Sequence, residues 1–163
     1  MVLGDVNAAA LCANGYIPHV IEGWAYRNAL PVARCASDLS SAELRAAHQR
    51  GLAGIDVLDD HNKFNPSGTV VGTVVGSEFD DVTSSLRVGI MLKSGEHGSA
   101  VLERIRAGIA QTPPPPGAYA GLSMAHCVHT RRITEISVCT SPVFILLSYP
   151  RHSRDRPPPS ESM

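Results

Sequence analysis

The sequence predicts a mainly β protein with helices, an α+β fold in which about six or seven short strands form a β-barrel or sandwich decorated by two or three helices. The length of 163 residues suits one domain. A hydrophobic content of 44% against 18% charged residues is typical of a chain with a packed core. The third observation is the succession of short strand-like runs between turn and loop signals.

Two proline-rich stretches mark the organisation of the chain. Residues 113–116 are four consecutive prolines, which exclude helix interior and central strand because they lock φ and lack N–H donors. Residues 150–163 (PRHSRDRPPPSESM) are polar, rich in proline and without periodicity. We therefore expect one domain over residues 1–149 and a disordered tail or linker stub over 150–163.

The first half of the domain contains one strand and one well-delimited helix. Residues 19–26 (HVIEGWAY) have strand character. Ser40 followed by Glu43 is a capping-box pattern, which predicts that a short helix starts here. Gly51 is well placed to end that helix.

The second half alternates between strands and a helix. We expect strands at 54–58, at 69–75 with Gly72 at a bend or close approach, and at 86–92, where Leu86, Val88, Ile90 and Leu92 alternate with other residues. An amphipathic helix is expected over 99–110. Two further strands are expected within 119–128 and 132–139.

Charge and cysteine content exclude several classes of protein. The net charge of −1 argues against a protein that coats nucleic acid by charge, and it gives no reason to expect a membrane surface as partner. The longest apolar run, 143–147, is far too short to span a bilayer. The four cysteines lack close CxxC spacing, so we expect reduced thiols in a reducing compartment, with no metal and no cofactor.

His61 is the first candidate for chemistry. It follows the expected buried strand 54–58 and enters a loop, a placement in which a rigid element holds a general base. Asp59 and Asp60 precede it; they would favour its charged form if close, or be solvated loop acids if not. The competing interpretation is a surface histidine in an acidic turn.

Ser123 and Glu135 are the other two candidates. Ser123 lies in an apolar strand-like segment (AGLSMAH) that is not the GxSxG nucleophile elbow, which disfavours an α/β-hydrolase. Glu135 lies within a β-branched strand, where acidic residues are depleted. A satisfied structural serine and an outward-facing glutamate are the alternatives.

Spacing connects Ser123 with Glu135. They are twelve residues apart, and a hairpin with its turn centred on His129 would place them directly opposite each other. A histidine from another strand could then contact both, accepting the serine proton while the carboxylate orients the ring. A slip of one residue in the register would break this alignment.

These segments together resemble the capsid-maturation serine proteases, namely the prohead proteases of tailed phages and the related herpesvirus assemblins. The family's G-L-S-φ motif is matched by 121–124, and its E-V-S-φ-V-x-x-P strand by 135–142. A histidine after a buried strand is matched by His61, and a G-φ-A strand near the start by 23–25. The resemblance covers roughly residues 18–145.

The resemblance implies a closed or nearly closed β-barrel ringed by helices, with residues 1–149 as a protease domain. It implies that His61 is the general base, Ser123 the nucleophile and Glu135 the orienting acid. The implied activity is a serine endopeptidase that cleaves itself and the internal scaffold protein during capsid maturation. The implied state is a homodimer inside the assembling procapsid, in the cytoplasm for a phage or the nucleus for a herpesvirus-like virus.

Several points stay open at this stage. The Gly-Arg-Arg motif of herpesvirus enzymes is missing, which leaves the oxyanion donors open, with backbone N–H groups near Ser123 or within 140–144 as candidates. His126 or His129 could replace Glu135 as third member of the triad. The rival functions are a non-catalytic β-barrel module of a virion or scaffold, and a cysteine hydrolase. The latter would use Cys127 or Cys139 with one of those two histidines.

Overall fold

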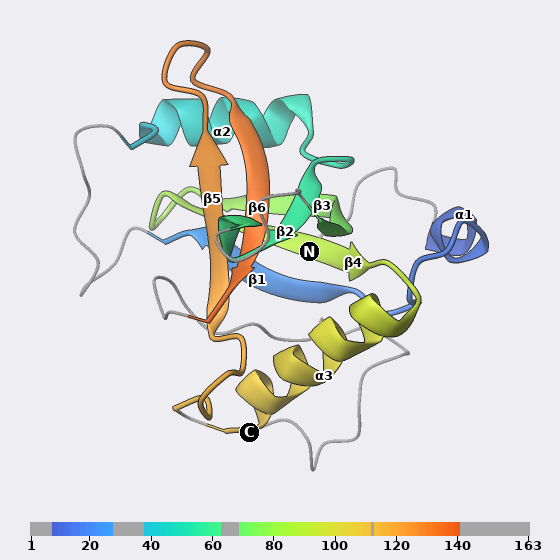
Figure 1. Cartoon of the computed structure of the whole chain (residues 1–163). Helices are drawn as coiled ribbons and strands as arrows, with labels where there is room; N and C mark the ends of the chain where they lie inside the picture. The colour runs from blue at the N-terminus through green and yellow to red at the C-terminus, as the bar shows by residue number, and fades with distance from the viewer. Residues whose placement is uncertain (1–7, 28–37, 63–68, 112, 141–163) are drawn as a thin grey trace.

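A computed structural model describes residues 8–27, 38–62, 69–111 and 113–140 of the chain (Figure 1). The elements, in chain order, are α1 (Ala8–Ala13), β1 (Ile21–Tyr26), α2 (Ser41–Arg50), β2 (Asp56–Asp59), β3 (Val70–Asp80), β4 (Ser85–Leu92), α3 (Glu96–Ala110), β5 (Gly121–His126) and β6 (Ile133–Cys139). A short turn, Asp60–Asn62, follows β2 directly. The tail 150–163 lies outside the described residues.

The strands form one six-stranded sheet in the order β1-β4-β3-β2-β6-β5 (Figure 1). Neighbouring strands are antiparallel except for β2 and β6, which run parallel. The two edge strands, β1 and β5, contact each other, so the sheet curls into a nearly closed barrel. The predicted α+β barrel with about six or seven strands is therefore confirmed, with six strands.

The helices and strands expected from the sequence are present, with some shifted ends. The prolines at 113–116 lie in the loop between α3 and β5, as predicted. Helix α1 was not expected. Strand β3 continues five residues beyond the expected end at Val75, because a bulge between Val74 and Gly76 lets it keep pairing with β4. Strand β4 is buried along nearly its whole length instead of on one face only.

The core is a single cluster inside the barrel. It combines the alternating residues of β4 with apolar residues of α3 and of the remaining strands. Gly72 lies directly against the backbone of β4, since a β-carbon there would collide with the backbone carbonyl of Met91. The expected close approach at Gly72 is thus present, and Val101, Leu102 and Ile105 carry the apolar face of α3 into the cluster.

Helix α2 is fixed at its N-terminus by two interactions of Glu43. The predicted capping box forms, with Ser40 N–H donating to Glu43 Oε1 at 2.9 Å and Glu43 N–H donating to Ser40 Oγ at 3.1 Å. Arg131, in the β5–β6 turn, donates to both oxygens of the same carboxylate at 2.9 and 3.0 Å. The bond with Arg131 and the capping bonds lower the pKa of Glu43 from 4.5 to about 2.

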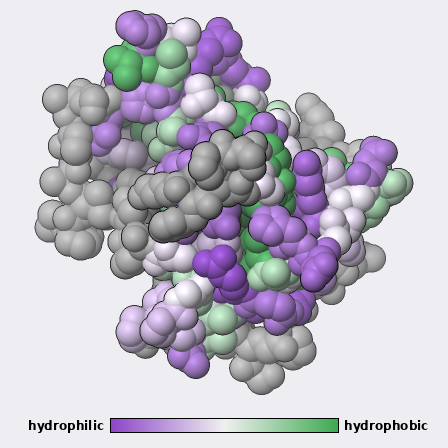
Figure 2. Space-filling view, viewed as in Figure 1, coloured by the Kyte–Doolittle hydropathy of each residue, from purple (hydrophilic) through white to green (hydrophobic). Residues whose placement is uncertain are grey.

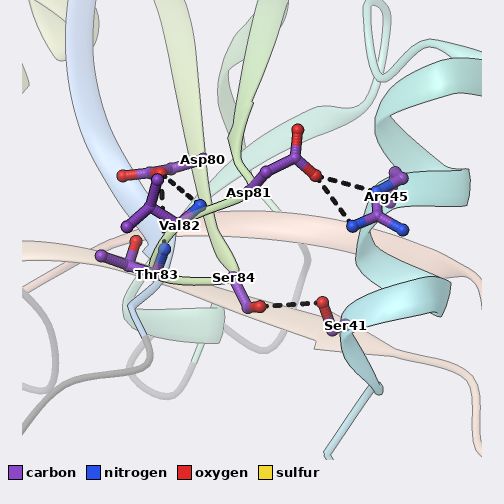
Figure 3. Close-up of polar contacts among 7 residues, drawn as sticks. All are labelled: Ser41, Arg45, Asp80, Asp81, Val82, Thr83 and Ser84. Carbon is purple, nitrogen blue, oxygen red and sulfur yellow. Dashed lines mark hydrogen bonds and ion pairs between the residues drawn. The ribbon is translucent and has the colours of Figure 1, made fainter.

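The turn between β3 and β4 is held against the other face of α2 (Figure 3). Arg45 donates two hydrogen bonds to Asp81 Oδ1, at 3.0 and 2.8 Å, and Ser41 donates to Ser84 Oγ at 2.9 Å. Asp80 caps the turn by accepting from the backbone N–H of Val82. The acidic turn after β3 therefore docks the helix onto the barrel.

The face seen in Figure 2 is mainly polar, with a band of apolar residues beside the grey atoms and a separate apolar patch at the top of the view. Val82 and Val128, each in a turn at the end of a strand pair, are the exposed large apolar side chains of the described residues. No helix within the described ranges is both long and apolar enough to cross a membrane.

Replacing Gly108 by alanine should destabilise the fold. Alanine is the better helix former by about 1 kcal/mol, but a β-carbon at this position would collide with the Tyr119 carbonyl oxygen. Overpacking of this kind costs about 1–3 kcal/mol, so we expect a lower urea midpoint for Gly108→Ala. Ser99→Ala, at an exposed position of α3, is the control and should keep or raise the midpoint. Stabilisation by Gly108→Ala would contradict the close packing.

Glu43 should make stability fall at acidic pH. Its folded pKa lies below its ordinary value, so its contribution is complete above pH 4.5 and is lost as the pH falls toward about 2. Glu43→Gln keeps a capping side chain but no charge, and its urea midpoint should vary less than that of the wild type across this window. Asp56→Asn, which removes an exposed carboxylate, should leave the wild-type pH dependence unchanged.

Candidate active site

The three predicted site residues come from three neighbouring strands or their ends. His61 lies in the turn that follows β2, Glu135 lies in β6, and Ser123 lies in β5. Since the sheet order is β2-β6-β5, the strand that carries Glu135 lies between the other two. The fold thus brings together β2, β6 and β5, the strands that carry or precede the three candidates (Figure 1).

His61 and Glu135 meet on the outer face of the sheet. His61 Nδ1 lies 3.5 Å from Glu135 Oε1, and each side chain is 24% exposed. With Nδ1 directed at the carboxylate, Nε2 is the ring nitrogen left to exchange a proton with a reacting group. This is the arrangement of a base and its orienting acid.

The carboxylate of Glu135 is incompletely satisfied. Its second oxygen, Oε2, is buried and has no hydrogen-bond partner within the described part of the chain. A half-buried acid in this state costs stability, which is typical of a residue kept for function. The glutamate faces outward, as in the alternative interpretation, but its side chain is only 24% exposed.

The predicted register of the β5–β6 hairpin is wrong. Ser123 pairs with Ser137, and Glu135 pairs with Ala125. The hairpin closes where Cys127 N–H donates to Arg132 O and the N–H of Arg131, a residue with φ of 57°, donates back to Cys127 O, so the turn centres half a position after His129. A bulge between Ala125 and His126 adds the rest of the shift. Residues 121–125 therefore pair on β6 two positions later than predicted, and His126 pairs one position later, with Ile133.

A shift of two residues does not change the face of the sheet to which each side chain points. Side chains alternate along a strand, so Ser123, Ser137 and Glu135 still point to the same side of the sheet. Ser123 and Glu135 become diagonal neighbours, for which the separation is about 7–8 Å. A histidine ring is the right size to bridge such a diagonal.

Ser123 forms no hydrogen bond with His61 in this structure. Its side chain is partly exposed, and its hydroxyl has no partner among the described residues. Catalytic hydrogen bonds of unliganded enzymes are often long and tighten only when substrate binds. The geometry therefore brings together the histidine and the acid, and the serine lies on the same face with a hydroxyl that has no hydrogen-bond partner among the described residues.

The two alternative histidines lie toward the hairpin turn. His129 is in the turn itself and exposed. His126 pairs with Ile133, beyond a bulge that follows the pairing of Ala125 with Glu135. Of these candidates for the orienting role, Glu135 is the side chain found next to the His61 ring.

Asp59 and Asp60 are not solvated loop acids, and neither forms a bond with the His61 ring. Asp60 is buried and accepts the Thr140 backbone N–H at 3.0 Å and the Thr140 hydroxyl at 3.2 Å. Asp59 points to the other side of β2, where Arg104 Nη1 is 4.0 Å from Asp59 Oδ2. Burial, followed by the bond with Asp59, raises the pKa of Tyr119 well above its ordinary value.

Sequence reasoning missed Ser137 and Thr140. Ser137 is fully buried and its Oγ accepts the His61 backbone N–H at 2.9 Å. The available signal was a polar residue two positions after Glu135 in an otherwise apolar strand. Because the Thr140 N–H donates to Asp60, it is occupied as a donor; the remaining oxyanion candidates of the 140–144 segment lie outside the described residues.

The thiols offer a weaker site. Cys139 is buried, and Cys127 lies at the start of the hairpin turn, where bonds with Thr130 lower its pKa. Cys12 is also a free thiol, and Cys35 lies outside the described residues. In the described ranges, no group of three or more His, Cys, Asp or Glu side chains is placed to hold a metal ion.

Comparison with known proteins identifies no relative of this chain. No family model matches the chain, and no curated protein is significantly similar to it in sequence. The functional argument therefore depends on the geometry of this site and on the motifs in the sequence.

Glu135→Gln should be at least as stable as the wild type at neutral pH. The amide keeps the size of the side chain and removes a half-buried charge with an oxygen that has no partner. We expect a gain of about 0–1 kcal/mol in the free energy of unfolding, measured by urea titration. Glu103→Gln, on the exposed side of α3, should change stability by less than about 0.5 kcal/mol. A clear loss in Glu135→Gln would assign Glu135 a structural role.

Proposed function

We propose that this chain is a serine endopeptidase of the capsid-maturation type, with Ser123 as nucleophile, His61 as general base and Glu135 as orienting acid. The observation that carries the proposal is the 3.5 Å approach of His61 Nδ1 to Glu135 Oε1 on the sheet face that Ser123 shares. The order of the family motifs along the chain supports the same assignment.

The proposed reaction has two steps. Ser123 Oγ attacks the carbonyl carbon of the scissile peptide, and its proton passes to His61 Nε2 and then to the leaving amine as the C–N bond breaks. Water, deprotonated by His61, then attacks the acyl-enzyme and releases a carboxylic acid and free Ser123. General base catalysis contributes about 10²–10⁴-fold to such reactions.

Glu135 has an orienting role in this proposal. Its carboxylate accepts from Nδ1–H, which keeps Nε2 as the basic nitrogen and stabilises the imidazolium that forms in each step. The diagonal placement of Ser123 relative to Glu135 leaves room for the ring to extend from the turn after β2 toward the serine.

The proposed substrate is the scaffold or capsid precursor protein, with self-cleavage as a second reaction. The proposed setting is a homodimer inside the assembling procapsid, in the cytoplasm for a phage and in the nucleus for a herpesvirus-like virus. The resemblance of the motifs supports these points.

One observation favours the alternative function, a non-catalytic β-barrel module of a virion or scaffold. The Ser123 hydroxyl has no hydrogen bond with His61, so in this structure the nucleophile is not activated. On this alternative, His61 and Glu135 form a surface ion pair of small energetic value.

A fluorophosphonate distinguishes the two functions, since it labels an activated serine and not an ordinary hydroxyl. In the proposed reaction, Ser123 Oγ bonds to phosphorus, fluoride leaves and His61 takes the proton. Intact mass should show one adduct on the full chain, peptide mapping should place it on Ser123, and Ser123→Ala should remain unlabelled. His61→Ala and Glu135→Ala should react more slowly by about 10²-fold or more, whereas Ser99→Ala should react as the wild type.

Three outcomes would count against the proposal. Absence of label in folded wild type would favour the non-catalytic module. Label on Cys127 or Cys139 would favour the cysteine hydrolase. A normal labelling rate in Glu135→Ala would remove Glu135 from the mechanism and give the third role to His126 or His129.

A further inference from the structure

The backbone between β2 and His61 turns back sharply. In the parallel register of β2 with β6, Asp59 lies beside Val138, so a straight continuation would carry His61 beside Thr140. Five residues then separate it from Glu135, or about 16 Å at ~3.3 Å per residue. The observed separation between His61 Nδ1 and Glu135 Oε1 is 3.5 Å. The turn therefore decides whether the two side chains can meet.

The turn is built from two consecutive residues in the left-handed region. Asp60 has φ of 45°, and His61 has φ of 55° and ψ of 27°. Left-handed backbone costs about 1–2 kcal/mol for a residue with a β-carbon, although aspartate and histidine tolerate it better than most. Such a conformation persists only where the surroundings hold it in place.

Two side-chain contacts hold this turn, and both join it to β6. The buried Asp60 carboxylate accepts the backbone N–H and the hydroxyl of Thr140, the residue after the end of β6. The fully buried Ser137 hydroxyl accepts the His61 N–H at 2.9 Å. Each of the two left-handed residues thus has its own contact: Asp60 with Thr140, and His61 with Ser137.

The strand that anchors the turn also carries the acid. Glu135 and Ser137 are neighbouring side chains on one face of β6. The Ser137 hydroxyl binds the backbone of His61, and Glu135 lies beside the ring of His61. Any displacement of the turn relative to β6 changes the distance between ring and carboxylate directly.

We propose that Asp60 and Ser137 are positioning residues, which hold His61 in its left-handed conformation so that Nδ1 faces Glu135 and Nε2 faces the reacting group. This inference rests on the proposed function for its catalytic consequence. The placement of the ring itself does not depend on that function and can be measured separately.

The first measurement is the tautomer of His61, read from the chemical shifts of its two ring nitrogens in ¹⁵N-labelled full chain at a pH where the ring is neutral. His61→Ala identifies the resonances. We expect the Nδ1–H form in the wild type, because Glu135 Oε1 lies 3.5 Å from Nδ1 and a proton there would face the carboxylate. Asp60→Gly, which permits positive φ but lacks the carboxylate, and Ser137→Ala should each shift the ring toward a mixture of tautomers.

Two further variants distinguish the loss of the hydrogen bonds that hold the turn from a change in the backbone conformations open to residue 60. Asp60→Asn keeps a carbonyl oxygen for Thr140 and tolerates the left-handed region, so it should resemble the wild type. Asp80→Asn is the matched control, since Asp80 also caps a turn by accepting backbone N–H groups but lies at the β3–β4 turn. Its His61 tautomer should be unchanged. Urea titration checks that every variant is folded.

The second measurement is the rate of inactivation by the fluorophosphonate. Misplacement of a catalytic group by about 1 Å costs about 10²-fold, so Asp60→Gly and Ser137→Ala should lose about that factor in the maximal rate while the half-saturating concentration stays constant. Asp60→Asn should restore most of the rate. A merely structural role would not produce this pattern in folded variants.

The outcomes separate the two proposals. A wild-type tautomer and a wild-type rate in folded Asp60→Gly and Ser137→Ala would overturn the positioning role. So would a wild-type ring that lacks the Nδ1–H form. Disturbed tautomers together with no inactivation of any protein, including the wild type, would leave the positioning role standing and refute the endopeptidase.

Discussion

The parallel pairing of β2 with β6 is the contact on which the candidate site depends. It is the only parallel pair in the described sheet, and it places the end of β2 beside the strand that carries Glu135. An antiparallel β2 at this place would direct its C-terminal end, and with it His61, away from Ser137 and Thr140. The left-handed turn then returns the ring along β6, and the hairpin to β5 adds Ser123 on the same face.

Local sequence signals predicted the elements well because each has a local cause. The Ser40–Glu43 capping box forms as the pattern indicates, since both hydrogen bonds close within one helical turn. Gly51 ends α2 with φ of 93°, a conformation open to glycine. The α+β barrel could be predicted from the number and length of the strands, and the candidate residues were identified from their places at strand ends and in apolar strands.

The predictions that failed concerned contacts between distant residues or the geometry of single turns. The register of β5 with β6 is set by the backbone bonds of Cys127, Arg131 and Arg132, which no hydrophobic pattern encodes. The bulge that extends β3 depends on its pairing with β4, and the left-handed pair at Asp60 and His61 depends on contacts with the distant strand β6. For the same reason the contacts of Ser137 and Thr140 with the turn after β2 were not predicted, since their partners lie some eighty positions earlier in the chain.

That distance between partners has a consequence for the order of folding. The α2 turn and the β3–β4 and β5–β6 hairpins join nearby residues and can form early, whereas the β2–β6 pair must close a loop from position 57 to position 136. Long-range strand pairing is slow, so we expect His61 and Glu135 to come together late in folding. A chain that is still being synthesised, with β6 not yet made, cannot assemble this pair, and the site is delayed until the barrel is complete.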